Sequence, residues 1–143
     1  MMEGAGKGYS FFDHTADVGV VVRGETLTEV FIHAAQALTE LIAEDSALKP
    51  AQERTIVLQA EDARALLLAW LGELLFWFST DGFLPCVFKL ESATETALRG
   101  RIQGERFDPA RHTYGTEVKG ITRHQLRVER RDGRWEAQVI FDV

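Results

Sequence analysis

The chain has 143 residues, of which 45% are hydrophobic and 27% are charged, and its net charge is −6. This length suits one domain with a substantial hydrophobic core, and the composition is ordinary for a soluble globular protein. The negative net charge argues against strong direct nucleic-acid binding, which depends on basic side chains that neutralise phosphates. The single cysteine, Cys86, can form no internal disulfide, which indicates a reducing compartment and a cytoplasmic protein.

Neither a targeting segment nor a domain boundary is predicted. Residues 1–8 are rich in glycine and predict a flexible lead, without the basic region that opens a signal peptide. The longest apolar run, residues 65–71, is interrupted by Gly72 and Glu73, so we expect no membrane span. No linker or change of composition divides residues 9–143, which are expected to form one domain.

Seven segments either alternate apolar and polar residues or are short apolar runs bounded by turn residues, which predicts β-strands. They are residues 9–12, 18–23, 55–59, 87–90, 97–103, 117–129 and 135–141. Residues 131–133 predict a hairpin turn between the last two strands.

Two longer segments predict α-helices. Thr26 and Glu29 have the spacing of a capping box, and apolar residues then recur every three or four positions up to Ala43. Asp62 predicts the N-terminal cap of a second helix, and Gly82 supplies the left-handed residue that often closes one. Together the elements predict an α+β fold in which two helices pack on a mainly antiparallel sheet. The order strand, helix, strand occurs twice and hints at an internal duplication.

Acidic residues stand where predicted strands begin or end. Asp13 and His14 fall between the first two strands, where turn formation alone would explain them. Asp17 begins the second strand and has no such turn role. Asp142 follows the last apolar strand and precedes Val143, whose terminal carboxylate would lie close to it. If the two strands are neighbours, Asp17, Asp142 and Val143 bring together the hard oxygen ligands that calcium or magnesium prefers.

Other polar residues have weaker patterns. Lys119 lies in a predicted strand, where an isolated lysine is usually an exposed edge residue. The alternative is a cation held near the acidic residues or directed at a partner. The arginines between residues 123 and 134 predict a solvated hairpin rather than a phosphate-binding patch. Cys86 is predicted to be a buried structural thiol rather than a nucleophile. His112 and His124 lack the short spacing of a zinc site.

Taken together, these motifs resemble the archease family. The resemblance extends from Tyr9 to Val143 and rests on several ordered blocks. The matching positions are residues 12–19, residues 66–75, Gly104, Glu105, Asp108, His112, residues 117–119 and residues 140–143. The chain departs from the family at Gly120 and Arg123, where an alanine and an aromatic residue are usual.

The resemblance implies the archease fold and a protein cofactor rather than a stand-alone enzyme. Archeases assist the RtcB-type RNA ligase, which joins 2′,3′-cyclic-phosphate or 3′-phosphate RNA ends to 5′-hydroxyl ends in tRNA splicing and RNA repair. They promote guanylylation of the ligase's active-site histidine, support multiple turnover and broaden nucleotide use.

The resemblance also assigns roles to particular residues. It places a metal site, described with calcium, at Asp17, Asp142 and Val143, and a functionally essential lysine at Lys119. Asp13 and His14 are candidates to contact the metal ligands.

The residues leave two other functions open. A metal-dependent hydrolase acting on a small phosphate would use the same acidic residues to activate water. Against it, no phosphate-binding loop and no general base with its own pocket stand out in the sequence. The third possibility is a general chaperone for nucleic-acid-processing proteins.

Overall fold

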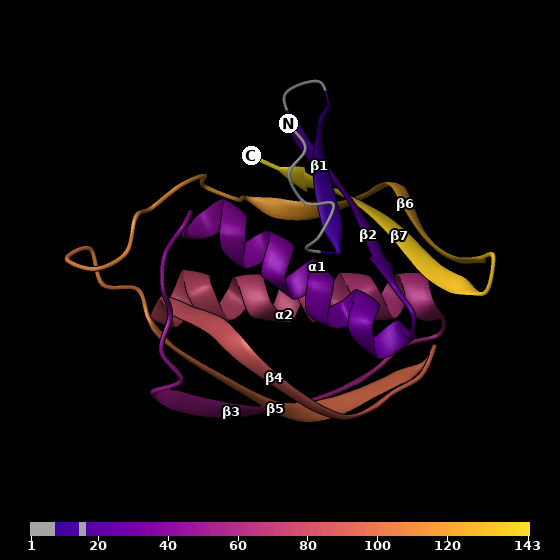
Figure 1. Cartoon of the computed structure of the whole chain (residues 1–143), viewed down its shortest axis with the longest axis horizontal. Coiled ribbons are helices and arrows are strands. Elements are labelled where there is room, and N and C mark those ends of the chain that lie inside the picture. Colours follow the sequence, from indigo (N-terminus) through magenta and orange to yellow (C-terminus); the bar gives the residue numbers. More distant parts are fainter. Residues whose placement is uncertain (1–7, 15–16) are drawn as a thin grey trace.

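The computed structural model describes residues 8–14 and 17–143, which form two helices and seven strands (Figure 1). In chain order the elements are β1 (Tyr9–His14), β2 (Asp17–Gly24), α1 (Leu27–Ile42), β3 (Gln52–Gln59), α2 (Ala63–Asp81), β4 (Phe83–Ala93), β5 (Ala97–Arg106), β6 (Gly120–Arg131) and β7 (Arg134–Asp142). Residues 1–7 of the predicted flexible lead lie outside the described residues, as do residues 15–16 between β1 and β2.

The strands form two antiparallel sheets, and the two helices lie between them (Figure 1). One sheet has the strand order β1-β2-β7-β6 and the other has the order β3-β5-β4. Helix α1 contacts β2 and β4, whereas α2 contacts β6 and β4, so each helix touches both sheets. The predicted α+β class is confirmed. The strands divide between two sheets because the helices have apolar side chains to bury on both sides.

Helix α1 begins and ends at its predicted signals. The N–H of Glu29 donates to Oγ1 of Thr26 (3.2 Å), as expected for the cap. The carboxylate of Glu29 accepts from the N–H of Glu25 (2.8 Å), one residue before the position that a capping box usually uses. At the other end, the N–H of Ala43 donates to the carbonyl of Thr39 (2.8 Å).

Helix α2 is the central helix of the core. Its predicted caps are confirmed, because Oδ1 of Asp62 accepts from the N–H of Ala65 (2.8 Å) and Gly82 has a φ of 71°. The indole N–H of Trp70 donates to the carbonyl of Phe31 (2.8 Å) and so ties the two helices together. By length and composition alone α2 would suffice to cross a membrane, but it packs between the two sheets. There it buries Leu66, Leu67, Trp70, Leu71, Leu74 and Trp77.

Strand β1 is longer than predicted. It continues through Asp13 and His14, which pair with Val18 and Asp17 of β2. The prediction that Asp13 and His14 lie in the turn is therefore wrong. Their pairing extends the β1–β2 hairpin up to residue 14, and Asp17 still begins β2 as predicted.

Strand β6 is displaced from its predicted range. It begins at Gly120 and ends at Arg131, whereas the alternating pattern predicted residues 117–129. The N–H groups of Gly115 and Thr116 donate to carbonyls at the end of α1 (2.8 and 2.7 Å). Because the segment before β6 is tied to the helix end, it does not join the sheet.

Candidate metal and partner site

The sheet register brings the opening and closing strands together. β2 and β7 are neighbours, and Asp17 pairs directly with Asp142. His14 pairs with Asp17 from β1, and Gly120 pairs with Asp142 from β6. Because directly paired residues share a face of an antiparallel sheet, these positions form one row across four strands. Figure 1 shows the C-terminus beside the β1–β2 hairpin.

Lys119 is held beside this row by its backbone. Its N–H donates to the carbonyl oxygen of Asp142 (2.7 Å), one residue before β6 begins. The side chains of Lys119 and Asp142 are exposed, while Asp17 and Val143 are half-buried. We call Asp17, Lys119, Asp142 and Val143 the acidic tip. The structure therefore brings together the four residues to which the sequence assigned the metal and the essential amine.

Asp13 and His14 belong to different rows of paired residues in the sheet. Asp13 pairs with Val18, which pairs with the buried Phe141, so it belongs to the row whose side chains lie on the other face of the sheet. His14 belongs to the row of Asp17. Contact of either residue with the metal ligands stays a prediction.

The oxygen atoms of the acidic tip suit a hard divalent cation. Two carboxylates stand opposite each other, and Val143 directly follows Asp142 at the same strand end. Among residues 8–14 and 17–143, no group of three or more His, Cys, Asp or Glu side chains is arranged to hold a metal ion. A cation here would therefore need main-chain or terminal oxygens in addition to Asp17 and Asp142.

A second polar cluster, centred on Glu105, fixes the segment that precedes β6. Glu105 lies at the end of β5 and is only 5% exposed. Its Oε2 accepts hydrogen bonds from the N–H of Lys49 (2.7 Å) and from Nε2 of His112 (3.1 Å), and its Oε1 pairs with the guanidinium of Arg111. The N–H of Asp108 donates to Nδ1 of His112 (2.8 Å), which places the proton of the neutral ring on Nε2.

Glu105 is ionised although it is buried. Burial raises the pKa of its carboxyl group, but hydrogen bonds from Arg111, the Lys49 main chain and His112 outweigh burial and lower that pKa from 4.5 to about 2. In the sequence, Glu105 and His112 are positions of the family resemblance without a predicted role, and the spacing of His112 from His124 argues only against a zinc site. The spacing of Glu105 and His112 along the chain was the one sequence signal that could have identified the cluster, because nothing in the local sequence shows that Glu105 is buried.

Aromatic contacts fix the middle of the same segment. The Tyr114 ring stacks on Phe78 of α2, with centroids 6.4 Å apart, and meets Phe107 edge-on at 6.0 Å. The segment from residue 107 to residue 119 is thus held by the Glu105 cluster, by these rings, by the end of α1 and by Asp142. Its last residue, Lys119, is the amine of the acidic tip.

Two further predictions concern the arginines and the cysteine. Arg127 pairs with Glu129 (2.6 Å) and Glu136 (2.9 Å), and Arg131 pairs with Glu129 (3.0 Å). These ion pairs support the predicted solvated hairpin.

Cys86 is partly exposed, so the prediction of a buried thiol is wrong. Partial burial, followed by the charge of Glu105, raises the pKa of the Cys86 thiol, which keeps it protonated at neutral pH.

These features define a class of small α+β proteins in which two antiparallel sheets enclose two helices. The second strand pairs with the last, and an aspartate of each stands in the same register position. The model of the Archease protein family matches residues 9–143. The chain belongs to the archease family.

Relatives named protein archease match nearly the whole chain. The protein from Methanosarcina mazei is 35% identical, with 99% of this chain and 100% of that protein covered. The protein from Pyrococcus furiosus is 37% identical, with 94% of this chain and 98% of that protein covered.

Two solved structures share the fold. The solution structure of protein 1598 from Methanobacterium thermoautotrophicum is 38% identical, has a TM-score of 0.81, and is matched over 96% of this chain and 99% of that one. The crystal structure of an archease from Thermotoga maritima, described as a possible chaperone, has a TM-score of 0.69 over 92% of this chain and 94% of that one. At 22% identity, this second likeness shows the fold alone.

Proposed function

We propose that this protein is a metal-binding cofactor of an RtcB-type RNA ligase. In this role it promotes guanylylation of the ligase's active-site histidine and supports multiple turnover in tRNA splicing and RNA repair, in the cytoplasm and without catalytic residues of its own. The observation that carries the proposal is the direct pairing of Asp17 with Asp142, with Lys119 hydrogen-bonded to the Asp142 main chain. Membership of the archease family supports it.

In this proposal Asp17, Asp142 and Val143 hold a divalent cation, calcium, through oxygen ligands. The bound cation supplies positive charge that offsets the repulsion between the carboxylates and links β2 to the end of β7. Because Asp17 and Asp142 already pair across the sheet, their backbone needs little rearrangement when the cation binds.

Lys119 provides the contact with the ligase. Its side chain is exposed, while its main chain is anchored to Asp142, so the ammonium group projects from a fixed point. The net charge of −6 suits docking at a basic, RNA-binding mouth of the ligase, where electrostatic attraction accelerates encounter. The partner is thus a protein, and strong direct RNA binding is not part of the proposal.

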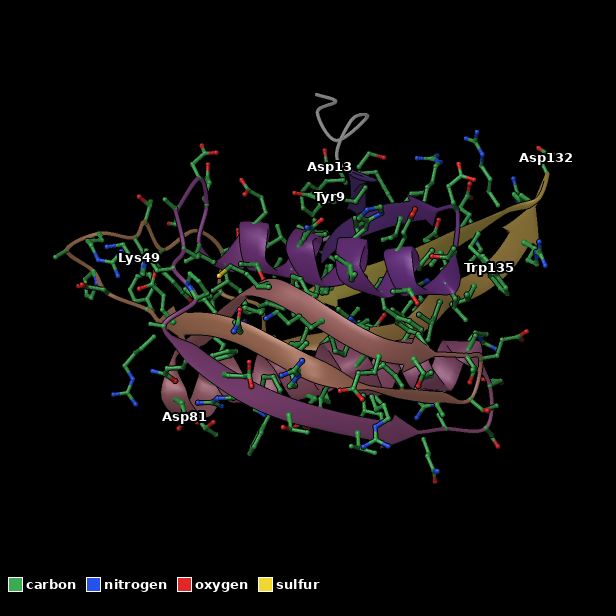
Figure 2. All side chains as sticks on the ribbon, turned by 60° about the horizontal axis from the view of Figure 1, so that its bottom comes forward. Tyr9, Asp13, Lys49, Asp81, Asp132 and Trp135 are labelled. Carbon is green, nitrogen blue, oxygen red and sulfur yellow. The ribbon has the colours of Figure 1, made fainter. Side chains whose placement is uncertain are left out.

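The experiment measures ligase guanylylation with wild-type protein and with two variants. Asp142→Asn removes one carboxylate and Lys119→Ala removes the amine, and each should reduce stimulation about tenfold or more, the value of one charge-assisted interaction. The matched controls are Asp132→Asn, in the turn at the opposite end of β7 (Figure 2), and Lys89→Ala, at an exposed site on β4. Wild-type stimulation by both Asp142→Asn and Lys119→Ala would reject the proposal.

A further inference from the structure

A groove of about 600 Å³ lies between α1 and β4 and is separate from the acidic tip. Its lining includes Tyr9, His33, Gln36, Glu40, Cys86 and Phe88. His33, Gln36 and Glu40 recur every three or four residues and so share one face of α1. Tyr9 begins β1, whereas the acidic tip lies at the other end of that strand. The volume is in the range that accommodates a small ligand or a long side chain.

The phenol of Tyr9 is a buried polar group with unused hydrogen-bonding capacity. Tyr9 is 6% exposed, and its hydroxyl makes no hydrogen bond with any residue that the structure describes. Burial, followed by the negative charge of Glu40, raises the pKa of this hydroxyl. Both residues line the groove. The hydroxyl can therefore pair with a ligand that enters the groove.

Glu40 is the one acidic residue among the described lining residues of the groove. Neither lysine nor arginine is among the described lining residues. The Glu40 carboxylate accepts one long hydrogen bond, from the N–H of Asp45 at 3.4 Å. Nδ1 of His33 lies 2.6 Å from the carbonyl oxygen of Arg23 and donates to it. A ligand that matches the Glu40 carboxylate and the Tyr9 oxygen carries several N–H donors and a positive charge.

We propose that this groove binds a guanidinium group. The planar guanidinium would donate two parallel hydrogen bonds to Glu40 and a further one to the Tyr9 oxygen. Phe88, which also lines the groove, would supply an aromatic ring for a cation–π contact with the group. An arginine side chain of a protein and a free guanidinium compound present this same group. The site is independent of the function proposed for the acidic tip.

The single cysteine of the chain provides a direct reporter, because Cys86 lines the groove. The full-length protein would be labelled with N-ethylmaleimide in the presence of agmatine, a free guanidinium compound, or of N-acetyl-arginine methylamide, which presents the group on a peptide backbone. Either probe should slow labelling severalfold and shift the amide NMR signals of the groove residues. The lysine analogue of the second probe should bind about tenfold more weakly, because its ammonium lacks the planar fork.

The relative strength of the two guanidinium probes identifies the source of the group. Tighter binding of the arginine amide indicates a partner's side chain, and tighter binding of agmatine indicates a free compound. Absence of protection and of NMR shifts with both probes would overturn the proposal.

Variants tie the binding to the named residues. Glu40→Gln should weaken both probes about tenfold, and Tyr9→Phe should weaken them severalfold. The matched control is Glu44→Gln, which removes the same charge at an exposed position beyond the end of α1 and outside the groove lining. It should bind as wild type does. NMR signals of the two sheets verify that each variant is folded, and unchanged binding by a folded Glu40→Gln would equally overturn the proposal.

Discussion

Glu105 shows how one residue can organise a long loop. Its buried carboxylate faces three donors from two separate parts of the chain: the Lys49 main chain, and the Arg111 guanidinium and His112 ring. A charged acceptor in the core is stable only because all three donors face it. Loss of its charge would leave those donors with a weaker acceptor, and the loop that leads to Lys119 would lose its first anchor.

Glu105→Gln should lower the free energy of unfolding by about 3 kcal/mol near neutral pH, as expected when a buried ion pair is broken. The wild-type pKa of Glu105 is lowered to about 2 from 4.5, so the folded state binds this proton less tightly than the unfolded state does. The stabilisation is therefore complete above pH 4.5 and is lost as the pH falls through about 2.

Urea unfolding of both proteins over this pH range tests the prediction. The difference in unfolding free energy between wild type and Glu105→Gln should shrink steadily on acidification. A difference that stays constant down to the lowest pH would show that the charge of Glu105 contributes nothing.

Among the elements, the segment from residue 113 to residue 119 is irregular yet firmly attached. The N–H groups of Gly115 and Thr116 donate hydrogen bonds to the final carbonyls of α1, which would otherwise lack partners. Lys119 then joins Asp142. The end of helix α1 thus determines where β6 begins and where the amine of the acidic tip lies.

Gly115→Ala tests this attachment. A Cβ at Gly115 would lie 2.6 Å from the carbonyl oxygen of Leu41, so the segment must move away from the helix end. We expect a loss of about 1–3 kcal/mol in unfolding free energy, as for other overpacked sites, together with weaker ligase stimulation. Gly120→Ala is the matched control, because its Cβ would meet nothing within 4 Å. Equal urea midpoints for the two variants would contradict the prediction.

For the molecule as a whole, the four-stranded sheet joins residues near opposite ends of the chain. Asp17 and Asp142 meet only when β2 and β7 have paired in the correct register. A cation that binds both residues would bind the folded state alone, because the unfolded chain does not bring these carboxylates together. Metal binding and global stability should therefore be linked.

Calcium should raise the unfolding temperature of the wild-type protein relative to the same protein in EDTA. At a free calcium concentration about 100 times the dissociation constant, the added stability is about 2.7 kcal/mol. Asp17→Asn should lose most of this shift, whereas Asp132→Asn should retain it because its turn is remote from the tip (Figure 2). Residues appended after Val143 should also reduce it. Calorimetry that finds the full shift in Asp17→Asn would exclude the proposed ligand set.

Local signals predicted the helices better than the strands. Thr26, Asp62 and Gly82 mark helix boundaries in the structure as they do in the sequence, because capping involves residues within one turn of each other. Strand limits depend on a partner elsewhere in the chain. The pairing of His14 with Asp17 lengthened β1, and the attachment of Gly115 to α1 shortened β6 at its start.

The sequence by itself determined the α+β class, the two capped helices and the acidic residues at the start of β2 and the end of β7, because these features depend on residues close together along the chain. Only the tertiary structure decided that β2 and β7 are neighbours, that Glu105 is buried among donors, and that Tyr9 and Glu40 share a groove. The physical reason is that these contacts join distant segments, whose register is set by the packing of both sheets around the helices.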